Sequence, residues 1–136
     1  VFLVKPKYGL STPKVFGAFD LSAVSPVDPE ELLKSFQQQG VQHSAWINDL
    51  EPPAFTVCPE LGELKAFLAS EEHGFQAVLM SGSGSTIYCI GEPQEGTEAF
   101  KAAVREKYDI EGIWRTNLVR RASVDEWYAA PEEQAE

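Results

Sequence analysis

The stretch LMSGSGSTIYCI, residues 79–90, places six small uncharged residues between two apolar runs. The flanking segments, FQAVLM at 75–80 and STIYCIG at 85–91, have the length and the aromatic or β-branched content of strands. Strands that follow each other so closely pair as an antiparallel hairpin. We therefore expect residues 81–86 to form a hairpin loop, which limits how the other elements can be arranged.

The loop SGSGST, residues 81–86, carries more hydroxyl groups than a turn requires. Four of its six residues are Ser or Thr, whereas a two-residue turn such as Asn-Gly suffices for a tight hairpin. It has neither the Lys of a GxxxxGK[ST] loop nor the third Gly of GxGxxG, and no helix is expected after it. Glycine lets a ligand approach the main chain, and hydroxyls add donors. The composition favours contact with an anion through backbone N–H groups, and a plain turn is the alternative.

A strand and a short helix are expected at the start of the chain. VFLVK, residues 1–5, is an apolar strand that ends before Pro6. The segment STP at 11–13 begins a helix, because a hydroxyl can cap it and proline suits its first turn.

Two longer helices have apolar stripes at helical spacing. The first, at 29–39, is capped by Asp28 and ended by Gly40, and the second covers 59–70. We expect both stripes to face the core. They consist of Leu32, Leu33 and Phe36 in the first helix, and of Leu61, Leu64, Phe67 and Leu68 in the second.

The segment NDLEPPAF, residues 48–55, lies between these two helices. A helix through Pro52 and Pro53 is possible only if both lie in its first turn. Asn48 or Asp49 can cap this turn, since short polar side chains accept hydrogen bonds from free N–H groups. Capping is the favoured role of the pair, and Asp49 as a catalytic base is the alternative.

The rest of the chain completes the order of elements. A helix at 95–108 presents Phe100, Val104 and Tyr108 on one side, and IEGIWRTNLVRRA at 110–122 alternates as a last strand. Residues 131–136 are expected to form a flexible acidic tail. If the helices before the hairpin form one layer, the order is β-α-β-β-α-β. The sequence thus predicts an α+β, ferredoxin-like domain, with a four-stranded antiparallel sheet and helices packed on one face.

Charge and composition disfavour several classes of function. Among the 136 residues, 21 are acidic and 11 basic, and the net charge of −10 repels nucleic acid and anionic membranes. No apolar run reaches the roughly 20 residues needed to span a bilayer. Cys58 and Cys89 lack metal-site spacing, so we expect no metal site and a buried, unreactive Cys89. The chain begins within a strand and without an initiator Met, so we expect it to be part of a longer protein.

Four segments, taken in order, resemble one enzyme family. They are VKPKYGLSTPKVF at 4–16, NDLEPPAF at 48–55, MSGSGSTI at 80–87 and DEWY at 125–128. Together they resemble the GHMP kinases, and among these the plant and algal kinases that phosphorylate 4-diphosphocytidyl-2-C-methyl-D-erythritol. The resemblance implies that residues 1–130 are the C-terminal domain of a two-domain kinase of the non-mevalonate isoprenoid pathway. Such a kinase transfers the γ-phosphate of ATP to the 2-hydroxyl of its substrate.

The resemblance also implies where the chemistry lies. ATP and Mg²⁺ belong to the full-length enzyme, and the ATP loop and the catalytic Lys and Asp lie on the N-terminal domain, which this chain lacks. We therefore expect no catalytic residue here, no activity and no bound cofactor for the chain alone, and a location in the chloroplast stroma or, alternatively, the bacterial cytoplasm. The residues expected to line the substrate and phosphate cleft are Ser81, Gly82, Ser83, Gly84, Ser85, Thr86, Ser11 and Thr12, with Asn48 and Asp49 shaping it.

The same sequence is compatible with two other functions. The chain could belong to another GHMP small-molecule kinase, or be a non-catalytic ferredoxin-like module that binds a ligand or a partner chain. Lys5 and Lys7 could neutralise phosphates, although a solvated strand end is favoured. We expect Trp46 and Trp114 to be packing residues, and the carboxylates of Asp109, Glu111, Glu71 and Glu72 to be solvated.

Overall fold

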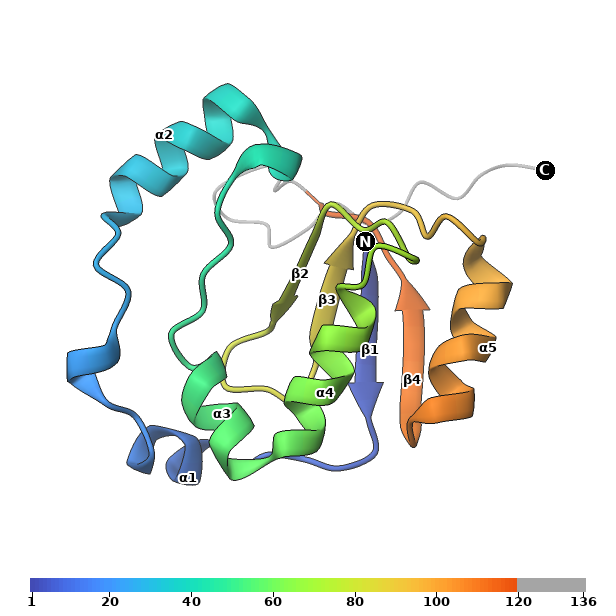
Figure 1. The fold of residues 1–136 in the computed structure, drawn as a ribbon, viewed down its shortest axis with the longest axis horizontal. Coiled ribbons are helices and arrows are strands. Elements are labelled where there is room, and N and C mark those ends of the chain that lie inside the picture. Colours follow the sequence, from blue (N-terminus) through green and yellow to red (C-terminus); the bar gives the residue numbers. More distant parts are fainter. Residues whose placement is uncertain (120–136) are drawn as a thin grey trace.

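The structure, a computed structural model, describes residues 1–119, and its elements follow the predicted order (Figure 1). The strands are β1 (Phe2–Pro6), β2 (Ala77–Met80), β3 (Ile87–Ile90) and β4 (Ile110–Arg115). The helices are α1 (Thr12–Gly17), α2 (Pro29–Gln39), α3 (Glu51–Val57), α4 (Pro59–Leu68) and α5 (Thr97–Lys107), with short 3-10 helices at Leu21–Ala23 and Val41–His43. None of these helices is long and apolar enough to cross a membrane.

The four strands form one antiparallel sheet in the order β2-β3-β1-β4. Strand β1 lies between β3 and β4, with Val4 opposite Ile87 on one side and Ile113 on the other. This is the strand order of a ferredoxin-like domain, so the predicted fold class is confirmed. The hairpin is confirmed as well, because β2 and β3 flank residues 81–86.

The last strand is shorter than predicted. It ends at Arg115, which pairs with Phe2, and the Thr116 N–H donates to the Val1 carbonyl at 2.8 Å. The Val1 amine donates in turn to the Thr116 carbonyl at 3.1 Å, and residues 116–119 form no regular strand. The rest of the predicted strand at 120–122, the DEWY segment and the predicted tail at 131–136 lie outside the described residues.

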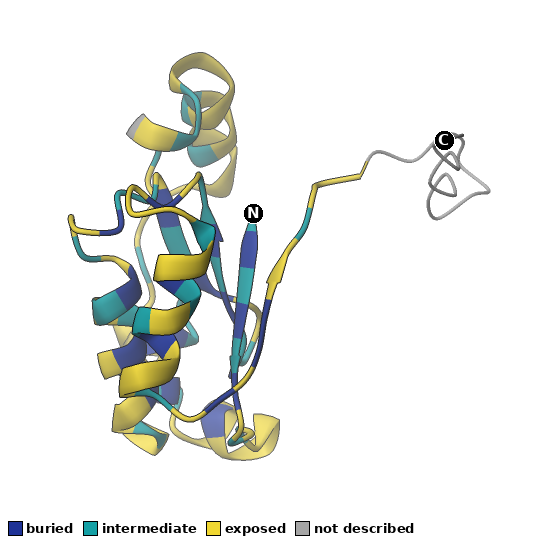
Figure 2. Ribbon diagram, turned by 90° about the vertical axis from the view of Figure 1, so that its right-hand side faces the viewer, coloured by how far each residue is buried: buried dark blue, intermediate teal, exposed yellow. Residues whose placement is uncertain are grey.

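One face of the sheet forms the core. Alternate strand residues such as Phe2, Val4, Ile87 and Cys89 are fully buried. Helices α4 and α5 cover this face (Figure 2). The covering side chains, predicted from the helical stripes, include Leu61, Leu64, Leu68, Phe100 and Val104, each with no exposed surface.

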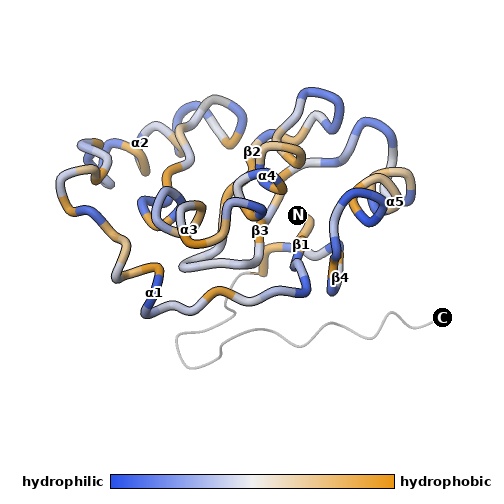
Figure 3. The backbone as a smooth tube through the Cα atoms, turned by 60° about the horizontal axis from the view of Figure 1, so that its bottom comes forward, coloured by the Kyte–Doolittle hydropathy of each residue, from blue (hydrophilic) through white to orange (hydrophobic). Residues whose placement is uncertain are grey.

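Helix α2 differs from the prediction, because none of its residues is buried. Its cap is as expected, since the Asp28 carboxylate accepts from the Glu30 N–H at 2.8 Å. However, Leu33 exposes 57% of its surface and Phe36 40%. The helix lies apart from α4 and α5 in both Figure 1 and Figure 3. The expectation that its stripe faces the core is therefore wrong.

The stripe of α2 faces a groove instead. Leu32, Leu33 and Phe36 line this groove together with Trp46, Leu79 and Tyr88. The side chains of Leu79 and Tyr88 belong to the second face of the sheet, which α4 and α5 do not cover. Segment 40–47 brings Trp46 over this face, and the ring of Phe36 meets that of Trp46 edge-on at 5.8 Å.

The two tryptophans differ in how far they pack. Trp46 is half-buried, and its indole Nε1 donates to the Val41 carbonyl at 2.9 Å, as expected of a packing residue. Trp114 exposes 48% of its surface, although its ring lies across Gly112, where a Cβ would be 2.3 Å from the indole. Trp114 therefore packs against Gly112 of its own strand, while about half of its surface stays exposed.

Candidate functional site: the glycine loop and its supports

The loop at 81–86 closes the β2–β3 hairpin with its own hydrogen bonds. The Ser81 N–H donates to the Thr86 carbonyl at 2.8 Å, and the Gly84 N–H donates to the Ser81 carbonyl at 3.0 Å. Gly82 has φ +57° and Gly84 has φ +86°, conformations that residues with a Cβ adopt only at a cost. The two glycines are therefore required by the backbone path of the loop.

The outer part of the loop is accessible to a ligand. Ser81 and Gly82 are exposed, and Ser83, Gly84 and Thr86 are half-buried. The N–H groups of Gly82 and Ser83 donate to no other group in the described part of the chain. Two successive free N–H groups on an exposed glycine turn can donate to the oxygens of an anion.

The inner part of the loop packs against the core. A Cβ on Gly84 would lie 2.9 Å from both Leu10 Cδ1 and Met80 Sδ. Ser85 is buried, and its hydroxyl donates to the Tyr8 carbonyl at 2.8 Å. This hydroxyl ties the end of the loop to the segment after β1, so its proton is engaged within the protein.

The loop also contacts helix α1. Thr12 Oγ1 and Ser83 Oγ lie 2.9 Å apart and share a hydrogen bond, although the residues are 71 positions apart in the sequence. Ser11 occupies the N-cap position of α1 and is exposed, but its side chain forms no capping hydrogen bond. The structure thus brings two separately predicted segments of the site together.

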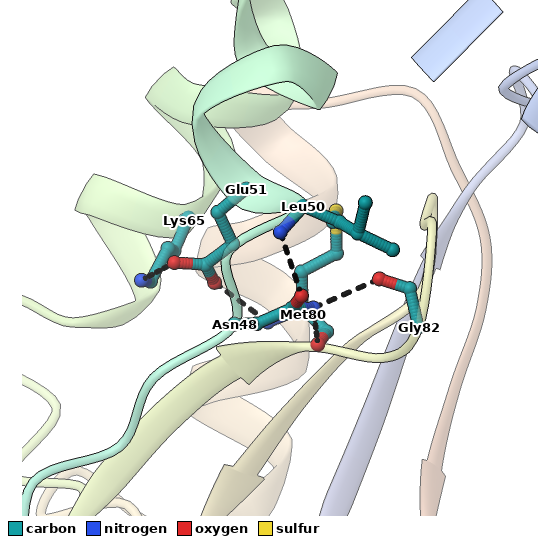
Figure 4. A network of polar contacts seen from close by, with 6 residues as sticks. All are labelled: Asn48, Leu50, Glu51, Lys65, Met80 and Gly82. Carbon is teal, nitrogen blue, oxygen red and sulfur yellow. Dashed lines mark hydrogen bonds and ion pairs between the residues drawn. The ribbon is translucent and has the colours of Figure 1, made fainter. Parts of the chain in front are cut away.

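Asn48 holds the start of the loop (Figure 4). Its Nδ2 donates to the carbonyls of Met80 and Gly82, each at 2.8 Å, and its Oδ1 accepts from the Leu50 N–H at 3.0 Å. Leu50 occupies the N-cap position of α3 and provides no side-chain cap, but its own N–H donates to Asn48 Oδ1. The amide of Asn48 therefore caps the turn that leads into α3, as predicted, and also holds the loop through Nδ2.

Asp49 points to a different part of the molecule. Its Oδ1 accepts from the Ser25 N–H at 3.0 Å, and it lines a small hollow with Asp20, Pro52 and Pro53. It therefore anchors the segment before α2, and within residues 1–119 its side chain forms no hydrogen bond with α3 or with the glycine loop. The structure separates Asn48 and Asp49, which the sequence presents as a pair.

Glu51 and Lys65 complete the support of the loop, and the sequence patterns predict this role for neither residue. Glu51 exposes 8% of its surface, and its Oε1 accepts from the Met80 N–H at 2.8 Å. Its Oε2 pairs with Lys65 Nζ on α4. A Glu in the first turn of a helix indicates only a favourable interaction with the helix dipole, so no local signal identifies this contact.

The lysines near the end of β1 are paired with carboxylates of the chain. Lys5 pairs with Glu111, and Lys7 Nζ lies 2.6 Å from Asp109 Oδ1. All four side chains are at least one-third exposed. These ion pairs favour the surface role of Lys5 and Lys7, and the carboxylates of Asp109 and Glu111 are exposed to solvent, as predicted, although each is paired with a lysine.

Cys89 lies in the core, on the strand next to β1. Cys89 is fully buried, and this burial raises its pKa to about 12. The predicted unreactive thiol is therefore consistent with its surroundings. In residues 1–119, no group of three or more His, Cys, Asp or Glu side chains is arranged to hold a metal ion.

These features define a class of protein. It is a ferredoxin-like domain whose sheet carries, at one end, a Ser-Gly loop that is accessible to an anion. The family model described as "GHMP kinases C terminal" matches residues 25–110, and the chain belongs to this family. Its similar curated proteins include the kinases named for 4-diphosphocytidyl-2-C-methyl-D-erythritol. The enzyme from Solanum lycopersicum is 37% identical over 130 residues, and that from Arabidopsis thaliana is 38% identical over 130 residues.

These matches cover most of this chain and a minor part of the relatives. The aligned region is 95% of this chain but 31% of the Solanum lycopersicum protein and 33% of the Arabidopsis thaliana protein. A solved structure titled "Crystal structure of 4-(cytidine 5'-diphospho)-2C-methyl-D-erythritol kinase" matches with a TM-score of 0.61 and 29% identity. It covers 83% of this chain and 40% of the solved chain. The chain thus spans about a third of the length of these curated relatives.

Proposed function

We propose that this chain is the C-terminal part of a kinase that phosphorylates the 2-hydroxyl of 4-diphosphocytidyl-2-C-methyl-D-erythritol with ATP. The observation that carries the proposal is the glycine loop, whose Gly82 and Ser83 N–H groups have no acceptor within residues 1–119 and whose position is held by Asn48 and Thr12. Similarity to kinases named for this substrate over 95% of the chain supports the choice of substrate.

The residues of the loop have a defined task in this proposal. The N–H groups of Gly82 and Ser83, with the hydroxyl of Ser81, donate to phosphate oxygens of the substrates in the cleft. Phosphoryl transfer depends mainly on positioning and on neutralising charge, so fixed donors of this kind lower the barrier. Mg²⁺, bound with ATP in the whole enzyme, supplies the main neutralising charge.

The other groups needed for catalysis are proposed to lie in the remainder of the kinase. The ATP loop and the catalytic Lys and Asp are proposed to lie outside these 136 residues, so the chain alone is expected to be inactive. The chain therefore completes a cleft whose other wall is the N-terminal domain. Its partners in this proposal are that domain and the small-molecule substrate.

The proposed location of the whole enzyme is the chloroplast stroma. Relatives from Solanum lycopersicum, Arabidopsis thaliana, Oryza sativa and Mentha piperita have names that place them in the chloroplast. Similar kinases also occur in bacteria such as Protochlamydia amoebophila, at 43% identity over 94 residues, so a bacterial cytoplasm is the alternative. Import of the complete protein into isolated chloroplasts distinguishes the two locations.

The proposal is tested by joining this chain to the part of the Arabidopsis thaliana kinase that lies outside the matched region. Phosphorus NMR with ATP, Mg²⁺ and 4-diphosphocytidyl-2-C-methyl-D-erythritol follows the transfer. We expect the joined protein to form the phosphorylated product and ADP, and the chain alone to form neither. Turnover by the chain alone would contradict the assignment of the catalytic groups to the missing part. A joined protein that is folded but prefers a different acceptor alcohol would contradict the proposed substrate.

A further inference from the structure

We propose that Glu51 is a positioning residue for the glycine loop, which acts through the Met80 N–H and depends on Lys65 for its charge balance. The proposal rests on the proposed function, because it assigns to Glu51 a role in placing the donors of Gly82 and Ser83. Glu51 does not touch the substrate in this scheme. It determines where the loop begins.

The position of Met80 explains why such a residue is needed. Met80 is the last residue of β2, and among the described residues β2 is an edge strand that pairs with β3 alone. In a strand, the N–H and the carbonyl of one residue point to the same side. Those of Met80 point to the free edge, where Glu51 Oε1 accepts the N–H and Asn48 Nδ2 donates to the carbonyl, each at 2.8 Å.

Segment 48–51 therefore takes the place of a neighbouring strand at a single residue (Figure 4). A strand end at a free edge would otherwise leave these groups to solvent, and the loop could shift from its first residue onward. Because Asn48 also holds the Gly82 carbonyl at 2.8 Å, two side chains fix both sides of Ser81. The N–H groups of Gly82 and Ser83 come next in the chain, so their positions depend on this fixed start of the loop.

Lys65 makes the contact rigid. The carboxylate of Glu51 is almost completely shielded from solvent, and a buried carboxylate without a partner is strongly unfavourable. Lys65 Nζ on α4 pairs with Oε2, and this leaves Oε1 directed at Met80. The ion pair thus connects the loop to α4, whose leucines lie in the core, and the orientation of the loop follows the packing of that helix.

The test separates positioning from a contribution to stability with two double variants in the joined protein. Glu51→Gln with Lys65→Met removes both charges but keeps a side-chain oxygen that can accept the Met80 N–H. Glu51→Leu with Lys65→Met removes both charges and that oxygen as well, at similar side-chain volume. Glu60→Gln, at an exposed position of α4, is the control for loss of a carboxylate.

We expect the Gln-Met variant to keep kcat within about threefold of the parent, and the Leu-Met variant to lose at least about tenfold in kcat. The KM for ATP should change less than kcat, because the loop orients groups that are used in the transition state. In hydrogen exchange followed by mass spectrometry, the peptide spanning residues 79–86 should exchange faster only in the Leu-Met variant. The Glu60→Gln control should match the parent in all three measurements.

A Leu-Met variant that keeps the parent kcat and the parent exchange rate at 79–86 would overturn the proposal, whatever its unfolding temperature. If the Leu-Met variant does not fold, Asn48→Asp tests the same hold on Met80 from the other side, with Asn117→Asp in an exposed segment as its control. An equal kcat for these two variants would then overturn the proposal.

Failure of the proposed function gives a different result. In that case the parent joined protein is folded but inactive toward 4-diphosphocytidyl-2-C-methyl-D-erythritol, and the exchange measurement alone decides whether Glu51 holds the loop. Equal exchange at 79–86 in the two double variants would overturn the hold itself. Faster exchange in the Leu-Met variant would support the hold of Glu51 on the loop, and only the proposed substrate would then be wrong.

Discussion

Helix α4 packs Leu61, Leu64 and Leu68 against the sheet, whereas α2 leaves Leu33 and Phe36 in contact with solvent. The two helices are of similar length, and both begin with a proline in the first turn. Both have apolar residues at helical spacing, so each has a side suited to a core. The difference lies in what each helix meets.

The two faces of the sheet differ in how completely helices cover them. The face under α4 and α5 is closed, and Phe2, Phe75 and Phe100 meet there with ring centroids 5.1 to 5.8 Å apart. The opposite face keeps Leu3 and Tyr88 half-buried, and α2 reaches it only through the groove around Trp46. An apolar stripe therefore shows which side of a helix avoids water, but not whether a surface is present to cover it.

The largest expected effect is at Leu64 on the closed face. Leu64→Ala should lower the free energy of unfolding by about 3 kcal/mol, because it removes a fully buried side chain and leaves a cavity. Urea unfolding followed by circular dichroism measures the change. A loss below about 1 kcal/mol would mean that the core under α4 is loosely packed and that the two helices differ less than described.

The glycine loop should show the next largest effect, because its inner side borders the closed face. Gly84→Ala should destabilise the protein by about 2 kcal/mol, since its Cβ would lie 2.9 Å from Leu10 and Met80 and its φ is +86°. Gly82→Ala, at φ +57° in open space, is the control for backbone strain alone. Equal losses of stability in the two variants would show that Leu10 and Met80 move aside without cost.

The buried thiol of Cys89, on the closed face of the sheet, should make the stability of the protein depend on pH in the alkaline range. Burial raises the pKa of Cys89 from 9.0 to about 12, so the folded state keeps a proton that the unfolded state releases. This contribution is complete below pH 9 and is lost as the pH rises toward 12, by up to about 1.4 kcal/mol per pH unit. Cys89→Ala should have a shallower slope over this range in urea unfolding. Parallel slopes for parent and variant would show that the thiol ionises without unfolding.

The smallest effect is expected at Leu33 on α2. Leu33→Ser should change the free energy of unfolding by no more than about 0.5 kcal/mol, because the side chain is already 57% exposed. The same variant should reduce binding of the dye ANS, which reports exposed apolar surface. A loss above about 1 kcal/mol would mean that α2 folds down onto the sheet in solution, and would remove the contrast with α4.

Much of the architecture follows from local patterns. The hairpin at 79–90, the Asp28 cap and the buried stripe of α4 depend on residues a few positions apart, and the structure has all three. The family resemblance predicts that residues 11–12 and the loop both line the substrate cleft, and in the fold Thr12 and Ser83 share a hydrogen bond. Strand β4 ends at Arg115, earlier than the alternation from residue 110 predicts, because a period of two does not show where pairing stops.

The supports of the loop could not be derived in the same way. An Asn before a helix predicts a cap, and Asn48 Oδ1 does accept from the Leu50 N–H, but nothing local predicts that its Nδ2 reaches 32 and 34 positions to Met80 and Gly82. Nothing near Glu51 in the sequence marks it as buried, since its surroundings are made by Lys65 and by the end of β2. No local pattern indicates partners for Lys5 and Lys7, which form ion pairs with Glu111 and Asp109 in the fold.

The sequence by itself determined the order of the elements, the hairpin with its glycine loop, and membership of the GHMP kinase family, because periodicity, turn residues and motifs act over short stretches of chain. Only the tertiary structure decided that α2 lies over an open groove, that Asn48 and Glu51 hold Met80, and that Asp49 turns away from the loop. These outcomes depend on which surfaces meet after folding. The polar contacts involved join residues 24 to 34 positions apart, beyond the reach of any local pattern.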